Sequence, residues 1–275
     1  MKTLLIPISS YIPVAVVKKY ASFFVTPGKD KIHILKVTTS ADAISIIDPL
    51  GISFGPLYET SVLDDNKDLE QLAAELTSFG YTIDQTISPG FFDTEVINKS
   101  NELNPDFLLM FTHGSHSMVE DLFGTKTSHV FEKIKCPILV IPEDHDVQQI
   151  KKVAVGIHLD DDKNFEIMKD LFALSDEMQL ELSFIKIDSD YQIDIVDDSG
   201  VLTRLQKSYP GRVNYIVHRN AESLAKGLQE YASELHADLT VLFTTKKTFI
   251  EKLFHKSVTK DLVLHSKTPL LIYHY

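Results

Sequence analysis

An internal repeat constrains the fold of this chain more than any other feature of its sequence. Residues 106–112 (DFLLMFT) recur 132 positions later as residues 238–244 (DLTVLFT). The opening segment 2–8 (KTLLIPI) is similar to 151–157 (KKVAVGI), at an offset of 149. Self-similarity over this distance predicts two copies of one folded unit.

The two offsets differ, so the front part of the first copy must carry additional residues. We place this insert at about 38–65, a stretch rich in Gly, Pro and Ser. The polar segment 143–150 follows an apolar run and is typical of a linker. We therefore predict two domains, 1–145 and 146–275, with the insert in the first.

Each copy alternates strands and helices. The unbroken apolar run 107–111 is typical of a strand buried on both faces of a parallel sheet. The alternation predicts parallel sheets with right-handed crossovers, and hence an α/β fold of two tandem doubly wound five-stranded domains. The predicted strands are 4–8, 32–37, 81–87, 107–111 and 138–141, then 153–157, 180–187, 212–217, 239–244 and 270–273. The predicted helices are 13–24, 64–79, 92–103 and 128–134, then one that is capped by Asp161 or Asp162 and ends near Met178, followed by 199–208, 221–236 and 257–265.

The predicted ligand site lies beyond the carboxyl ends of the strands, where the strand order of such a sheet reverses. The segments 7–10, 37–39 and 112–127 are expected to meet there. Gly114 can take a positive φ or let a ligand approach its backbone. Gly124, at a predicted helix start, leaves backbone N–H groups that attract anions. An anion is therefore the ligand class that this edge of the sheet favours.

The spacing Phe111-x2-Gly114-x9-Gly124-Thr125 resembles the nucleotide loop of the universal stress protein family, which reads Gly-x2-Gly-x9-Gly-Ser/Thr. The resemblance implies a Rossmann-like fold in both halves, similar to that of adenine nucleotide alpha hydrolases. It implies the tandem form of the family, with degenerate ATP-binding motifs.

A second point of resemblance is Cys136-Pro137 before an apolar strand, which stands in the family's register. In the family, the last strands of two domains pair antiparallel across a dimer interface. The resemblance therefore implies a pseudo-dimer within this chain, in which 138–141 pairs with 270–273.

The resemblance also implies where ATP would bind in the first half. Phe111 stands where the family has a glycine, and Ser9 stands where ATP-binding members carry an aspartate. Nucleotide binding is therefore expected to be weak or lost in the first half, with ATP as the alternative cofactor there. The candidate cofactor-binding residues are Pro7, Ser9, Val37, His113, Gly114, Ser117, Gly124, Thr125, Lys126 and Thr127.

The equivalent loop of the second half keeps none of its glycines. Phe243, Lys246 and Lys256 occupy the three positions. A β-carbon raises the cost of a left-handed φ by roughly 1–2 kcal/mol, which weakens a phosphate cradle of backbone amides. We expect nucleotide binding to be lost in this half, and no cofactor is called for.

Catalytic and metal-binding patterns are weak. His113, His116 and His129 invite a zinc interpretation, but no Cys or carboxylate is placed beside them by the sequence, and we assign no metal. Cys136 is interpreted as a buried small residue rather than a nucleophile. No Walker loop and no Gly-x-Ser-x-Gly motif occurs, so we assign no catalytic residue and expect no enzymatic activity.

Net charge and cysteine content limit which classes of partner and which cellular compartment we expect. The net charge of -12 argues against nucleic acid, because neutralising phosphates needs clustered Lys and Arg. No apolar run is long enough to span a membrane, so no membrane partner is expected. The single cysteine rules out an internal disulfide and fits a reducing compartment. With no signal-peptide pattern at the N-terminus, we expect a cytoplasmic protein.

Three function hypotheses follow. The leading one is a tandem universal stress protein that is non-catalytic and acts in stress-response signalling through an unidentified protein partner. Family resemblance implies a homodimer. The first alternative is an ATP-binding stress protein, with slow ATPase activity, that uses the first half. The second alternative is a small-molecule carrier that holds its ligand against Phe111 or Phe243.

Overall fold

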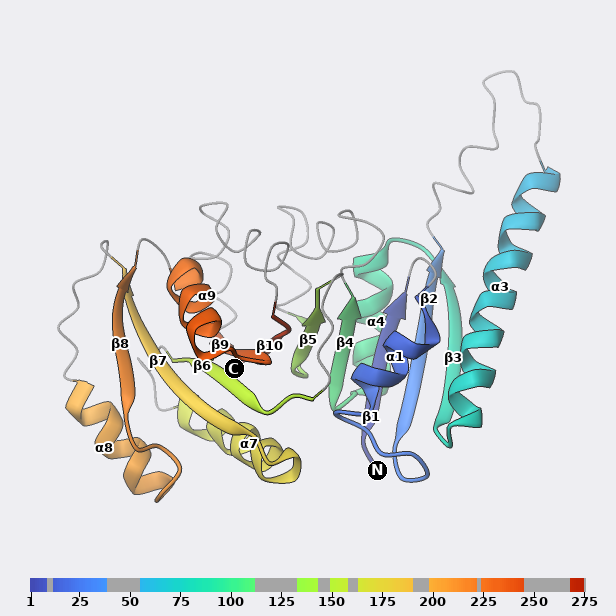
Figure 1. Ribbon diagram of the computed structural model, residues 1–275. Coiled ribbons are helices and arrows are strands. Elements are labelled where there is room, and N and C mark those ends of the chain that lie inside the picture. Colours follow the sequence, from blue (N-terminus) through green and yellow to red (C-terminus); the bar gives the residue numbers. More distant parts are fainter. Residues whose placement is uncertain are drawn as a thin grey trace. The chain divides into compact units, whose positions relative to one another are not determined.

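The computed structural model describes residues 1–8, 12–38, 55–111, 133–142, 149–157, 163–189, 198–221, 224–244 and 268–274. The chain divides into two compact units, Met1–Cys136 and Pro137–Tyr275 (Figure 1). Each unit is a mostly parallel sheet flanked by helices, so the predicted α/β fold class is confirmed. Within these residues, no helix is long and apolar enough to cross a membrane.

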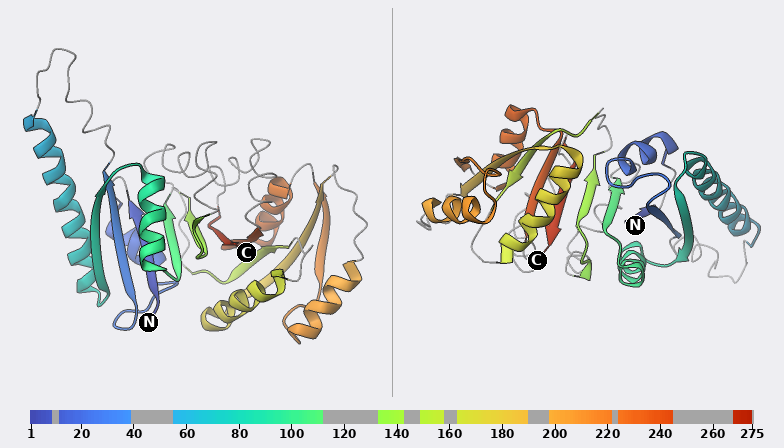
Figure 2. Two further views of the ribbon diagram at one scale, coloured as in Figure 1. Left: turned by 180° about the vertical axis from the view of Figure 1, so that it is seen from behind. Right: turned by 90° about the horizontal axis from the view of Figure 1, so that it is seen from below.

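Unit 1 contains a sheet in the order β3-β2-β1-β4, with its strands parallel. Figure 2 shows α1 and α4 on opposite faces of this sheet, which makes it doubly wound. The strands are β1 (Thr3–Ile8), β2 (Lys31–Thr38), β3 (Thr82–Pro89) and β4 (Phe107–Phe111). The helices are α1 (Val14–Ala21), α3 (Gly55–Ser78) and α4 (Phe92–Leu103).

Unit 2 contains the order β5-β10-β9-β6-β7-β8. Its strands are β5 (Ile138–Ile141), β6 (Lys152–Gly156), β7 (Glu181–Ser189), β8 (Ile216–Ala221), β9 (Leu239–Thr244) and β10 (Leu270–His274). Its helices are α7 (Lys163–Met178), α8 (Asp198–Ser208) and α9 (Leu224–Leu235).

The strand β5 lies beside β10 in the sheet. It pairs antiparallel with β10, with Leu139 opposite Leu271, as predicted for a pseudo-dimer within the chain. The remaining pairs of this sheet are parallel. Every residue of β5 is buried, as expected of an apolar strand that is paired within a sheet. As a result, β5 is counted with unit 2, and the predicted boundary after residue 145 stays a prediction.

Strand register confirms the internal repeat. In unit 1, Leu4 lies opposite Phe107, and in unit 2, Val153 lies opposite Leu239. These two pairs are related by the offsets 149 and 132 found in the sequence. The central strand pair of each sheet is therefore built from equivalent residues.

The additional residues of the first copy lie between β2 and β3. Ile34 pairs with Gln85, whereas its counterpart Phe184 pairs with Ile216, so the offset falls from 150 to 131 between these strands. The predicted insert at 38–65 falls in this interval, and its bounds stay a prediction because 39–54 lies outside the described residues.

Several predicted element boundaries differ from the structure, and the starts of α3 and β8 are clearly wrong. Helix α3 begins at Gly55 instead of residue 64, and Pro56 is tolerated in its first turn. Strand β8 begins at Ile216 instead of residue 212, because Arg212 ends a turn and contacts α7. In both cases turn-forming residues lie beside the boundary, and from the sequence alone they do not show where the helix or strand begins.

Candidate functional site

The predicted site lies at the carboxyl ends of β1, β2 and β4. The strand order reverses between β1 and β4, which is where ligands bind in open α/β sheets. Pro7 and Val37 stand at these ends, and both are buried. The structure therefore places these two candidate residues at the expected edge.

The other candidate residues lie outside the described part of the chain. Their role in ligand binding stays a prediction. They are Ser9, His113, Gly114, Ser117, Gly124, Thr125, Lys126 and Thr127.

Phe111, the last residue of β4, points into the core. Its side chain is 2% exposed, and its ring packs edge-on against Tyr20 of α1, with 6.1 Å between ring centroids. Tyr20 is itself buried. The benzyl group at this position is therefore enclosed by α1 and offers little surface to a ligand.

Phe243 holds the equivalent position at the end of β9. It is 7% exposed and stacks on Tyr273 of β10, with centroids 5.5 Å apart and an angle of 23° between the rings. Burial raises the pKa of Tyr273, so its hydroxyl stays neutral. Aromatic packing thus fills this place in both units.

The end of β6 is also closely covered. A β-carbon on Gly156 would lie 3.1 Å from Leu242 and 3.3 Å from Leu228. Both leucines are buried. The carboxyl ends of the central strands of unit 2 therefore present apolar carbon, with little room beside the backbone.

Cys136 is a buried thiol. It is 8% exposed, and burial raises its pKa to about 12, although a hydrogen bond with Ser100 acts in the opposite direction. At neutral pH it is almost entirely protonated and unreactive. The interpretation of Cys136 as a buried small residue is confirmed.

The histidines considered for zinc, His113, His116 and His129, lie outside the described residues. In the part of the chain that the structure describes, no group of three or more His, Cys, Asp or Glu side chains could hold a metal ion. The structure thus adds no metal ligand set to those considered from sequence.

A surface hollow of about 420 Å³ lies between α1 and the end of α3. The ammonium group of Lys18 lies 3.3 Å from the centre of the Phe79 ring at this hollow. Neither of the two candidate cofactor residues that the structure describes, Pro7 and Val37, lines it. The lining residues are Val14, Ala15, Lys18, Lys19, Ser22, Glu75 and Phe79.

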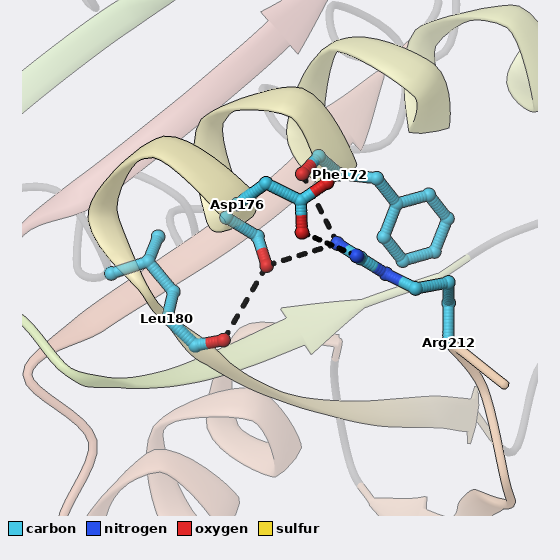
Figure 3. Close-up of polar contacts among 5 residues, drawn as sticks. Phe172, Asp176, Leu180 and Arg212 are labelled. Carbon is cyan, nitrogen blue, oxygen red and sulfur yellow. Dashed lines mark hydrogen bonds and ion pairs between the residues drawn. The ribbon is translucent and has the colours of Figure 1, made fainter.

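Sequence reasoning missed a polar cluster around Arg212 in unit 2 (Figure 3). Its guanidinium pairs with Asp176 and donates to the carbonyl of Phe172 at 3.1 Å and to the hydroxyl of Ser175 at 3.3 Å. It also lies 5.0 Å from the centre of the Phe172 ring. The cluster binds the last turns of α7 to the turn before β8, which is a structural role.

A second polar residue missed in the sequence is His33 of β2. It is only 5% exposed, although it is surrounded in the sequence by the apolar residues of a buried strand. Only the packing of α4 and β3 reveals its environment, so no local signal could have singled it out.

Comparisons with known proteins give a family match for the second half of the chain and show the fold of nearly the whole chain. Residues 153–274 match the universal stress protein family. A universal stress protein from Archaeoglobus fulgidus aligns over 99% of this chain and 96% of its own, with a TM-score of 0.72 and 16% identity. A putative universal stress protein from Pseudomonas aeruginosa aligns over 99% and 93%, with a TM-score of 0.65 and 12% identity.

The fold extends to a transporter domain. The cytoplasmic domain of a prokaryotic cation chloride cotransporter aligns over 98% of this chain and 94% of its own, with a TM-score of 0.55 and 10% identity. No curated protein matches the sequence. At these identities the likenesses to solved structures show the fold alone, over nearly the whole chain.

Proposed function

Because residues 153–274 belong to the universal stress protein family and the chain has the fold of its tandem members, we propose that it is a non-catalytic stress-response module. It signals by binding a protein partner rather than by turning over a substrate. Nucleotide binding is lost in unit 2 and weak or lost in unit 1.

The observation that supports this proposal most strongly is the packing of Phe243. The sequence aligns this residue with a glycine of the family's nucleotide loop, and the ring is buried on Tyr273. A phosphate cradle needs backbone N–H groups that a ligand can approach closely. Apolar side chains over Gly156 further reduce the space at the same edge.

The same reasoning supports weak binding in unit 1. Phe111 occupies the glycine position there and packs beneath α1. The sequence of this half nevertheless keeps Gly114, Gly124 and Thr125. ATP binding by unit 1, with slow hydrolysis, is therefore the second candidate function.

The carrier hypothesis receives less support. It places the ligand against the ring of Phe111 or that of Phe243. Rings that are 2% and 7% exposed have little surface for a metabolite to contact. We therefore do not include a carrier role in the proposed function.

The proposal includes a cytoplasmic location and the possibility of a homodimer. A lone, buried cysteine is compatible with the reducing conditions of a cytoplasm. Pairing of β5 with β10 occupies the last strand of each repeat within one chain. A homodimer of this protein would therefore have to use another surface.

The test is thermal melting of the purified protein with and without millimolar Mg-ATP, together with analysis of nucleotide released on denaturation. A ligand at about 100 times its dissociation constant stabilises a fold by roughly 2.7 kcal/mol. The proposal predicts no released nucleotide and no more than a small shift. A large shift abolished by Gly124→Val would favour the second candidate, and stoichiometric released ATP or ADP would contradict the proposal.

A further inference from the structure

A buried histidine lies between the sheet of unit 1 and α4. His33 of β2 is 5% exposed, and its Nε2 lies 3.0 Å from the hydroxyl oxygen of Thr86 on β3. Its Nδ1 is buried and has no hydrogen-bond partner in the described structure. Either neutral tautomer therefore leaves one ring nitrogen unsatisfied, and the protonated ring would leave a buried N–H donor unpaired as well as charged.

The side chains around His33 are charged. On the strands, Lys31 of β2 forms an ion pair with Asp84 of β3, and Asp84 lies opposite His33 in the sheet. From α4, Lys99 and Glu102 face the ring and pair with each other at 2.7 Å. Two cations and two carboxylates thus surround the imidazole from all three elements.

Desolvation decides the balance among these charges. Burial is the largest influence and lowers the pKa of His33 below its ordinary value. The positive charge of Lys99 lowers the pKa further and so does that of Lys31, whereas Asp84 and Glu102 act in the opposite direction. Folding therefore favours the neutral form of the His33 ring.

The second unit provides a natural comparison. Ser183 is the counterpart of His33, because it lies opposite Ala154 in the sheet as His33 lies opposite Leu5. Ser183 makes a hydrogen bond with the side chain of Tyr231 on α9. The position that holds a titrating histidine in unit 1 thus holds a serine in unit 2.

We propose that protonation of His33 releases α4 from β2 and β3, so that acidification loosens this face of unit 1 while unit 2 is unaffected. The helix leads directly into β4 (Figure 1). In the sequence, Phe111 at the end of β4 precedes Gly114 and Gly124. The switch therefore acts on the strand that precedes the candidate ligand loop. The inference does not depend on whether that loop binds a nucleotide.

The direction of the effect follows from proton linkage. A histidine whose pKa is depressed by folding binds protons more readily in the unfolded or locally open state. Stability is complete above the ordinary histidine pKa of about 6.5 and is lost as the pH falls from there toward the folded value. Within that window the opening equilibrium rises by up to about tenfold per pH unit.

The experiment is hydrogen exchange of the full chain between pH 7.5 and 5.5, corrected for intrinsic exchange rates and followed separately in α4 and α9. The variants are His33→Ser, which introduces the residue found in the other unit, and His218→Ser, which removes an exposed histidine as a control. We expect opening of α4 to increase by up to about tenfold in total between pH 7.5 and 5.5 in wild type and in the control, with most of the increase below pH 6.5. In His33→Ser the increase should fall below about twofold, and α9 should show no increase in any of the three.

Equal acceleration of α4 in wild type and His33→Ser would overturn the proposal, and so would the absence of acceleration in wild type. If His33→Ser does not fold, the NMR titration of His33 in the wild-type chain decides. Titration below the ordinary pKa, with matching shifts of α4 amides, supports the switch. An ordinary titration with unchanged α4 amides rejects it.

Discussion

Asp238 and Lys152 bind each other twice through hydrogen bonds. The backbone N–H of Lys152 donates to the Asp238 carboxylate at 2.8 Å, and the N–H of Asp238 donates to the carbonyl of Lys152 at 2.8 Å. In unit 1, Asp106 and Thr3 repeat this arrangement, at 2.6 Å and 2.9 Å. Asp106 and Asp238 are the first residues of the repeated segments 106–112 and 238–244. Each aspartate thus fixes the register of a central strand pair at its start, β1 with β4 in unit 1 and β6 with β9 in unit 2.

Replacing this aspartate should destabilise its unit. Asp238→Ala removes an acceptor from two backbone N–H groups, those of Lys151 and Lys152, and should lower the free energy of unfolding by about 1–2 kcal/mol. Asp68→Ala removes an exposed aspartate of α3 and should cost less than about 0.5 kcal/mol. Urea denaturation of the two variants measures the difference, and equal midpoints would show that the paired hydrogen bonds contribute nothing.

Replacing Arg212 by either alanine or lysine should lower the stability of the protein. Its planar guanidinium donates to Phe172 and Ser175 while it pairs with Asp176, a geometry that an ammonium group cannot reproduce. Because the ion pair is partly exposed, we expect a loss of about 1–2 kcal/mol for Arg212→Ala and about half of that for Arg212→Lys.

Thermal denaturation measures both Arg212 variants, with Lys207→Ala on α8 as an exposed cationic control. Full stability of Arg212→Lys would show that only the charge matters. A loss in the control as large as that in Arg212→Ala would show that the cluster has no special contribution.

Gly227 of α9 should not tolerate the usual helix-stabilising replacement. In an exposed helix, Gly→Ala stabilises by roughly 1 kcal/mol. Here a β-carbon would lie 2.8 Å from that of Ala221 and 2.9 Å from Ile187, because the helix packs tightly on β7 and β8. Gly227→Ala should therefore destabilise the protein by about 1–3 kcal/mol.

Gly156→Ala serves as the comparison for this prediction. Its nearest contacts are the ends of two leucine side chains, at 3.1 Å and 3.3 Å, which can move more easily than a helix can. Chemical denaturation should show a smaller loss for this variant than for Gly227→Ala. Stabilisation by Gly227→Ala would contradict the tight packing of α9.

The thiol of Cys136 should react very slowly in the native protein. With the pKa raised to about 12, the thiolate fraction at pH 8 is on the order of 10⁻⁴, whereas an unfolded cysteine with a pKa near 8.5 is about one quarter thiolate. Alkylation by iodoacetamide should therefore be at least about 10³-fold slower in buffer than in denaturant. Mass spectrometry follows the reaction, and comparable rates in the two conditions would show that the thiol is exposed.

The repeat and the central strands could be predicted because they are encoded locally. Apolar runs such as 107–111 set the buried strands, and the matched offsets set their partners. The start of β8 could not be found in this way, since Val213 is buried before the strand begins and resembles its first apolar residue. The roles of Arg212 and His33 depend on helices distant in the sequence, so neither has a local signature.

The position of the candidate site could be predicted from the sequence, but the packing of its aromatic side chains could not. Pro7 and Val37 lie at the expected strand ends. The sequence could show that Phe111 and Phe243 replace glycines, but not which way the rings point. Their direction depends on Tyr20 of the helix α1 and Tyr273 of the strand β10, which lie far from them in the sequence.

The most direct test of the central claim is equilibrium dialysis of the full chain against radiolabelled Mg-ATP, with Gly124→Val beside the wild type. The account predicts at most one weak site per chain, and none once Gly124 is replaced, since aromatic packing fills the corresponding place in unit 2. A saturable site that persists in Gly124→Val would locate nucleotide binding in unit 2 and contradict the account.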